Sequence, residues 1–184
     1  MLLNGVRMAT TVQPMGMGAK CEALPVSLRE SLHRVSDPRS LDESVAEVFQ
    51  MMLGLECQRE PGSEDKEEES LTAVVGFGGL LSGACVISMG RSVSIEIAAL
   101  MTGMKIDEVD DTVKDGIGEL CNMVAGAWKG KVPELAANCG LSLPAVITGR
   151  DYRLHVQSPE FQLHHRYGFA ASHFSVTIVC DGLQ

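Results

Sequence analysis

A mixed α/β fold, of the α+β kind, is predicted by three features of the sequence. Apolar residues recur at helical spacing in two segments, which predicts amphipathic helices, and a shorter third helix is expected between them. Runs rich in β-branched residues lie between and after those segments and predict strands. Two of the helical segments also resemble each other, which suggests two related halves. The chain has 184 residues, enough for one such domain and an appendage.

The first 40 residues differ in character from the rest of the chain. They are rich in Met, Gly, Ser, Pro and Thr and show little periodicity, apart from a short helix expected near residues 24–35. We therefore expect residues 1–40 to form an N-terminal tail, partly disordered or helical, and residues 41–184 to form the folded domain.

The domain is expected to begin with a helix from residue 41. Ser40 can cap this helix with Glu43 completing a capping box, and Gly54 suits its end. An acidic linker follows over residues 57–70, and its run of acidic residues is expected to be solvated.

A β-hairpin and a second helix are predicted next. Residues 71–77 and 80–89 are apolar runs rich in β-branched residues, and the Gly78-Gly79 pair lies between them as a turn. A helix is expected over residues 92–101, ending near Gly103.

The third helix carries the clearest apolar stripe. Either Asp111 or Thr112 can cap it, and Gly130 can close it. The stripe consists of Val113, Ile117, Leu120, Cys121, Val124 and Trp128. Strands are predicted after it over residues 141–148, 154–157, 163–171 and 174–180.

The first and third helices can be aligned as an internal repeat. Glu47 falls on Glu119, and Gln50 falls on Asn122. A duplication would explain two half-domains, each a helix followed by strands. Chance similarity between two amphipathic helices is the alternative.

One polar edge of the third helix is the candidate site. Asp115, Glu119 and Asn122 fall within about 60° of each other on a helix and lie opposite the apolar stripe. A side-chain amide can accept from and donate to one water molecule, and a carboxylate can pair with a lysine of a partner. The nearby glycines, Gly116, Gly118 and Gly126, would let another surface approach the helix closely. An isolated E-x-x-N is most often a solvated helix face.

Composition argues against several other functions. The net charge of −9 disfavours nucleic acid and anionic membrane surfaces as partners. No signal peptide and no run of about 20 apolar residues is present, so a soluble, cytoplasmic protein is expected.

Metal binding is not expected either. The adjacent His164 and His165 would point to opposite faces of a strand, and His155 and His173 have no obvious partner carboxylate at ligand spacing. The six cysteines match no zinc or haem spacing and are expected to be buried free thiols. They are Cys21, Cys57, Cys85, Cys121, Cys139 and Cys180.

The polar edge resembles the signature of the CheC, CheX and FliY phosphatases. In that family an acid or Ser is followed by E-x-x-N and, later, by a proline. Asp115, Glu119 and Asn122 match the helix part, while Pro144 comes one position sooner than the usual spacing. The Gly-punctuated hairpin over residues 76–88 is also similar to that family. The resemblance covers residues 41–181 and implies a pseudo-duplicated domain with a central sheet and long helices on one face.

The resemblance implies a protein aspartyl-phosphate phosphatase of chemotaxis or other two-component signalling. Its substrate would be a phosphorylated CheY-like receiver, which would carry the Mg²⁺, and this chain would bind no cofactor. Asn122 would position the attacking water, Glu119 would bind the receiver lysine, and Asp115 and Pro144 would support the site.

Two further expectations follow from the same resemblance. Glu47 with Gln50 would form a degenerate second site, because Gln departs from the motif. One active helix per chain is most like CheX, which implies a homodimer. The alternative function is a non-catalytic module on the same fold that binds receivers or acts as a flagellar-switch-like scaffold.

Overall fold

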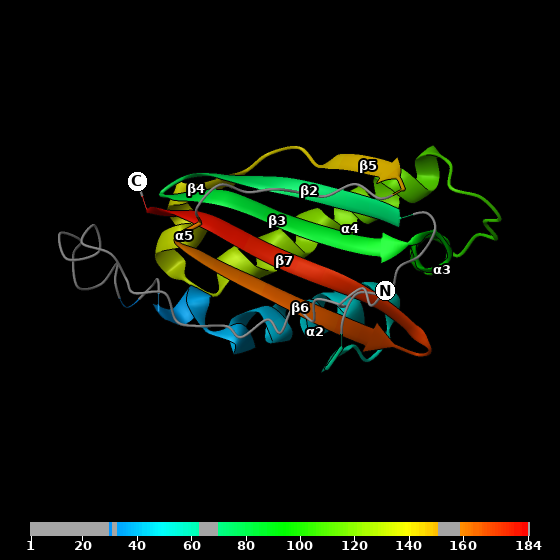
Figure 1. Cartoon of the computed structure of the whole chain (residues 1–184), viewed down its shortest axis with the longest axis horizontal. Coiled ribbons are helices and arrows are strands. Elements are labelled where there is room, and N and C mark those ends of the chain that lie inside the picture. Colours follow the sequence, from blue (N-terminus) through cyan, green and yellow to red (C-terminus); the bar gives the residue numbers. More distant parts are fainter. Residues whose placement is uncertain (1–29, 31–32, 63–69, 151–158, 184) are drawn as a thin grey trace, which may run out of the picture.

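One antiparallel sheet of seven strands organises the chain (Figure 1). A computed structural model describes residues 30, 33–62, 70–150 and 159–183. The helices are α2 (Pro38–Leu53), α3 (Arg91–Thr102), α4 (Asp111–Gly130) and α5 (Pro133–Asn138). The strands are β1 (Gln58–Glu60), β2 (Ser70–Gly79), β3 (Leu81–Gly90), β4 (Cys139–Leu141), β5 (Ala145–Gly149), β6 (Phe161–Phe169) and β7 (Ser172–Leu183).

The order of the strands supports a duplicated domain. The sheet runs β1-β6-β7-β3-β2, and β4 and β5 both pair with the outer side of β2. The pair β3–β7 is central, with β2 beside β3 and β6 beside β7. β1 belongs to the first half but pairs with β6 of the second, and β5 belongs to the second half but pairs with β2 of the first. Exchanging the halves therefore leaves the order unchanged.

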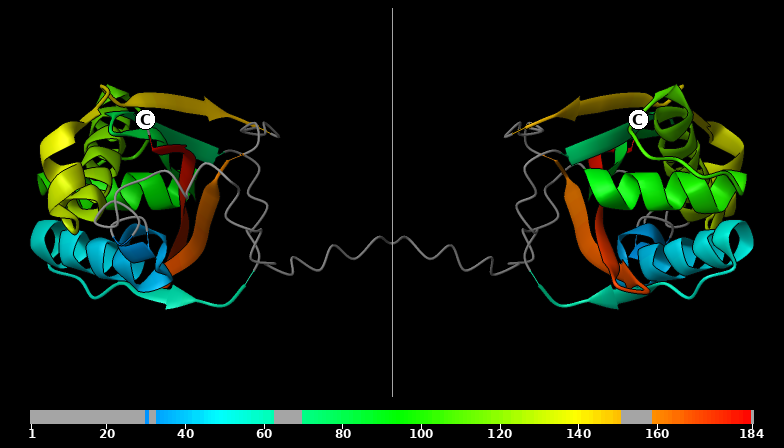
Figure 2. Two further views of the ribbon diagram at one scale, coloured as in Figure 1. Left: turned by 90° about the vertical axis from the view of Figure 1, so that its left-hand side faces the viewer. Right: turned by 90° about the vertical axis from the view of Figure 1, so that its right-hand side faces the viewer.

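The long helices cover one face of this sheet, as expected (Figure 2). α2 precedes the strands of the first half and α4 precedes those of the second, and the two helices pack against each other. α3 packs against α4 as well. This arrangement leaves the side of α4 that faces away from the sheet at the molecular surface.

The core between helices and sheet is built from the predicted stripe and the inner faces of the strands. All six residues of the α4 stripe are buried. Trp128 is fully buried and lies 5.3 Å from Phe77, centroid to centroid. Phe49 of α2 stacks on Phe174 at 4.8 Å. Val35, in the segment expected to be a tail, is fully buried in the same core.

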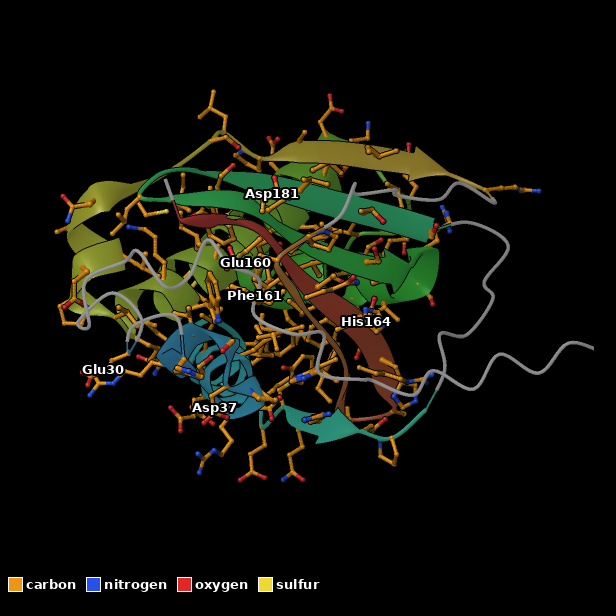
Figure 3. The ribbon with its side chains drawn as sticks, turned by 60° about the vertical axis from the view of Figure 1, so that its left-hand side comes forward. Glu30, Asp37, Glu160, Phe161, His164 and Asp181 are labelled. Atoms are coloured by element: carbon orange, nitrogen blue, oxygen red, sulfur yellow. The ribbon has the colours of Figure 1, made fainter. Side chains whose placement is uncertain are left out.

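Helix α2 begins earlier than predicted, so the expected Ser40–Glu43 capping box is wrong. Asp37 is the N-cap, and its carboxylate accepts from the Arg39 N–H at 3.0 Å at the start of the helix (Figure 3). Pro38 follows as the first helical residue, where its missing N–H costs nothing. The Ser40 hydroxyl donates to the Asp37 carbonyl at 2.7 Å instead of capping.

The ends of the other elements agree closely with the sequence. α4 is capped by Asp110, one residue before the expected Asp111 or Thr112, through a 3.0 Å bond from the Val113 N–H. It ends at Gly130 as predicted. Glycines in the left-handed conformation, Gly54 and Gly103, close α2 and α3.

Three parts of the prediction need correction. The strand expected over residues 141–148 is divided into β4 and β5, because Pro144 cannot donate to a ladder. The short helix α5 and strand β1 were not predicted, and β1 occupies part of the expected linker. The Gly78-Gly79 pair, expected as the turn, belongs to the end of β2 and pairs with β4, and only Leu80 separates β2 from β3. The helix expected near residues 24–35 lies mostly outside the described residues, and the strand expected over residues 154–157 lies wholly outside them.

The five described cysteines are free and buried, in agreement with the prediction; Cys21 lies outside the described residues. Burial raises the pKa of Cys57 to about 12. The pKa of Cys85 is also raised, through its contact with the Cys121 thiol and through burial. Thiols held protonated in this way are poor nucleophiles.

A partly buried polar cluster attaches α2 to the sheet. The Asp42 carboxylate of α2 accepts from the Tyr167 hydroxyl at 2.8 Å and lies 2.8 Å from His165 Nδ1. Arg59 of β1 approaches the same carboxylate at 3.7 Å. Burial lowers the pKa of His165 and outweighs the opposing effect of Asp42.

This cluster predicts that the protein loses stability on acidification. In the folded state the pKa of His165 lies below its ordinary value of 6.5. As the pH falls through 6.5, the unfolded chain therefore takes up a proton on His165 before the folded chain does. The free energy of unfolding therefore decreases from pH 7 towards pH 5. His165→Gln removes this contribution, so its urea-unfolding free energy should depend less on pH. Parallel curves for the two proteins would contradict the prediction.

Candidate functional site

The outer side of α4 presents the three polar residues that the sequence singled out. Asp115 and Glu119 are exposed and Asn122 is partly exposed, while the apolar stripe faces the sheet. The helix is therefore oriented as its periodicity predicts. A molecule that approaches the side of α4 facing away from the sheet can reach both the carboxylate and the amide.

Glu119 and Asn122 are also free of competing partners. Within the part of the chain that the structure describes, neither side chain makes a hydrogen bond or ion pair. Lys114, by contrast, is paired with Asp111 at 2.9 Å. An amide and a carboxylate left unpaired on a helix surface remain available for water or for a partner's groups.

The helix glycines are contacted by this chain's own segments. A Cβ at Gly118 would lie 3.3 Å from the Cβ and Cγ of Pro144 and 3.5 Å from Val146. A Cβ at Gly116 would lie 3.7 Å from Ala98 of α3. Another surface does approach the helix closely at Gly116 and Gly118, as expected, but that surface belongs to the same chain.

The contact at Gly118 brings Pro144 beside the site. Pro144 lies in the connection between β4 and β5, and Gly118 directly precedes Glu119. On a helix, Asn122 lies about 40° from Gly118, so the connection borders α4 on the Asn122 side. Only the resemblance to the CheC, CheX and FliY phosphatases suggested Pro144; the structure shows which residue of α4 it contacts.

A pair of substitutions tests this packing. Gly126→Ala is expected to stabilise the protein by up to about 1 kcal/mol, since Ala favours helix and its Cβ would meet only Leu141, at 3.9 Å. Gly118→Ala should gain much less, because its Cβ would press on Pro144. Urea unfolding measures both values, and equal gains would mean that Pro144 moves away freely.

The corresponding residues of α2 are placed differently. Glu47 and Gln50 are both exposed, but the Glu47 carboxylate is paired with Lys131 Nζ at 2.9 Å. Lys131 directly follows α4, and nothing in the sequence indicated this long-range pair. The carboxylate of the first helix therefore already has a cation as its partner.

Other kinds of site were sought in the described ranges. No group of three or more His, Cys, Asp or Glu residues there could hold a metal ion. Cys121, the thiol on α4, is fully buried, and its Sγ lies 3.6 Å from the carbonyl oxygens of Ala73 and Cys85. It cannot serve as a nucleophile for a substrate at the surface.

The same ranges contain no helix long and apolar enough to cross a membrane.

Comparisons with known proteins agree on one family. The family model described as "Chemotaxis phosphatase CheX" matches residues 71–165. The "CheY-P phosphatase CheX" of Thermotoga maritima is 30% identical over 115 residues, which make up 60% of this chain and 74% of that protein.

Solved structures show the same fold. The chemotaxis protein CheX of Vibrio vulnificus matches with a TM-score of 0.65 at 19% identity, over 77% of this chain and 94% of that one. A chain of the CheX–CheY–BeF3–Mg²⁺ complex of Borrelia burgdorferi matches with a TM-score of 0.62 at 18% identity, over 77% and 96% of the two chains. The expected α+β fold is thereby confirmed.

Proposed function

The chain belongs to the CheX family of chemotaxis phosphatases, and on that basis we propose that it hydrolyses the aspartyl-phosphate of a CheY-like receiver domain. The observation that carries this proposal is the unpaired Glu119–Asn122 edge on the exposed side of α4. The relative from Thermotoga maritima is named for activity on CheY-P, and the Borrelia burgdorferi structure contains CheX with CheY. Both support a receiver as the substrate.

In the proposed reaction the chain supplies position rather than a nucleophile. The Asn122 amide holds one water in line with the phosphorus atom, accepting from it through Oδ1 and donating to it through Nδ2. The water oxygen attacks phosphorus as the bond to the aspartyl oxygen breaks. The products are a free aspartate carboxylate and inorganic phosphate. Because an acyl phosphate is already activated, alignment of the water provides most of the acceleration required.

Glu119 is proposed to fix the register of docking. Its exposed carboxylate can pair with a lysine in the receiver's active site, and a charge-assisted bond of this kind is strong when the interface excludes water. Asp115 extends the same edge by one turn, and Pro144 supports the flank beside Asn122. Any Mg²⁺ is proposed to belong to the receiver.

Helix α2 is proposed to be inactive or weak as a second site. Its amide is the longer Gln50, and its carboxylate, Glu47, is held by Lys131 at 2.9 Å. A receiver lysine would have to displace that internal cation before it could pair with Glu47. One active helix per chain follows from this difference.

The activity is tested with phosphorylated receivers of two-component systems. Loss of phosphate should be faster with the protein present than for the receiver alone, at substoichiometric amounts of the protein. A protein that binds several receivers without altering their decay would instead be the non-catalytic scaffold on the same fold.

The homodimer is also a proposal. We expect sedimentation at micromolar concentration to give a species of twice the chain mass. A single species of one chain mass would reject the dimer without affecting the proposed chemistry, since Glu119 and Asn122 belong to the same helix.

A further inference from the structure

Leu143 is an exposed apolar side chain that the proposed chemistry does not use. It is 90% exposed, more than any other large hydrophobic residue in the described ranges. Met51 follows at 65% and Met104 at 54%. An isolated exposed leucine is common on protein surfaces, so its surroundings decide whether it has a role.

The backbone on both sides of Leu143 is held in place. The Ser142 N–H donates to the Gly76 carbonyl at 2.9 Å, and the Gly76 N–H donates to Ser142 Oγ at 2.9 Å. On the other side, Pro144 packs at the Gly118 position of α4 and restricts the backbone of the residue before it. Leu143 is thus presented to solvent by a fixed segment, which lowers the entropy lost on binding.

The same segment borders the proposed catalytic edge. Pro144 lies against Gly118, and Asn122 is on the side of α4 that faces this connection. A receiver that brings its phosphoryl group to Asn122 must therefore cover the connection as well. We propose that Leu143 is an apolar anchor for the receiver, contacting its surface beside the phosphorylation pocket and contributing to binding rather than to the chemical step.

This inference rests on the proposed function and deepens it. The occupant is a receiver domain because Pro144, the residue next to Leu143, contacts α4 at the Gly118 position, one turn from Asn122. Ile147, the other exposed large hydrophobic residue of this region, is 41% exposed. It points to the opposite face of the sheet from Val146, which contacts the Gly118 position. A receiver docked on α4 would not cover Ile147, which makes it the matched control.

The test compares wild type, Leu143→Ser and Ile147→Ser. KM for the phosphorylated receiver should rise about tenfold in Leu143→Ser, equivalent to ~1.4 kcal/mol, with kcat unchanged. The Kd for a beryllofluoride-activated receiver should rise by the same factor. Ile147→Ser should leave both constants near the wild-type values. Unfolding of each variant is measured in parallel.

Several outcomes would overturn the inference. An unchanged KM and Kd in Leu143→Ser, with wild type active, would reject the anchor and leave the proposed function standing. A change in sedimentation of Leu143→Ser, without a change in Kd, would assign Leu143 to contact with a second copy. An inactive wild type would reject the phosphatase, and the Kd comparison would still decide whether Leu143 contacts a receiver.

Discussion

Asn122→Ala is expected to remove the acceleration of receiver dephosphorylation, with a loss of roughly 100-fold or down to the receiver's own rate. The reason is that the amide is proposed to be the single group aligning the attacking water, and a methyl group can neither accept from that water nor donate to it. Time courses of phosphate release, with receiver in excess over the protein, measure the effect directly.

The helix itself should tolerate this change. Asn122 is partly exposed and makes no hydrogen bond within the described residues, so its loss leaves no buried group unpaired. Binding to an activated receiver should also be nearly retained, because Glu119 and the surrounding surface are intact. A low rate with retained binding would separate a catalytic defect from misfolding.

Gln50→Ala is the matched control, since Gln50 occupies the same place in the first helix as Asn122 in α4. It should leave the rate unchanged if α2 is inactive. Equal losses in the two variants would show that both helices act. Full activity of Asn122→Ala, with the wild type active, would remove the water-positioning role from this residue.

Periodicity predicted α4 well because its two faces differ sharply in polarity. The residues expected at the core are all buried, and Asp115 and Glu119 are exposed. The hairpin of β2 and β3 was also clear, since two long β-branched-rich runs flank the Gly78-Gly79 pair, although both glycines extend β2 and pair with β4. In these elements local sequence and tertiary environment require the same conformation.

The contacts around the site join residues that are distant in the sequence, so they could not be predicted from local patterns. Nothing near Glu47 or Lys131 in sequence indicates their pairing across 84 positions. Gly118 contacts Pro144 because of the path taken by the β4–β5 connection. That path follows from the pairing of β4 and β5 with β2. The Asp37 cap was missed because Ser40 offered an equally good local signal.

Trp128→Ala is expected to cause the largest loss of stability, about 3–5 kcal/mol of unfolding free energy. Trp128 is fully buried and packs on Phe77 at 5.3 Å and near Phe161 at 6.4 Å. Removing the indole leaves a cavity that α4 and the sheet can fill only by moving. Urea unfolding followed by circular dichroism gives the value.

Trp128→Phe should cost much less than Trp128→Ala, for two reasons. A phenyl ring fills most of the space and keeps contact with Phe77. The indole Nε1–H is also buried without a hydrogen-bond partner in the described structure, a state that costs about 1–3 kcal/mol. Phenylalanine removes that unpaired donor and recovers part of the packing loss. Equal costs for the two variants would contradict this account, because they would mean that the indole N–H has a hydrogen-bond partner. That hydrogen bond would then help to place α4, and with it Asn122.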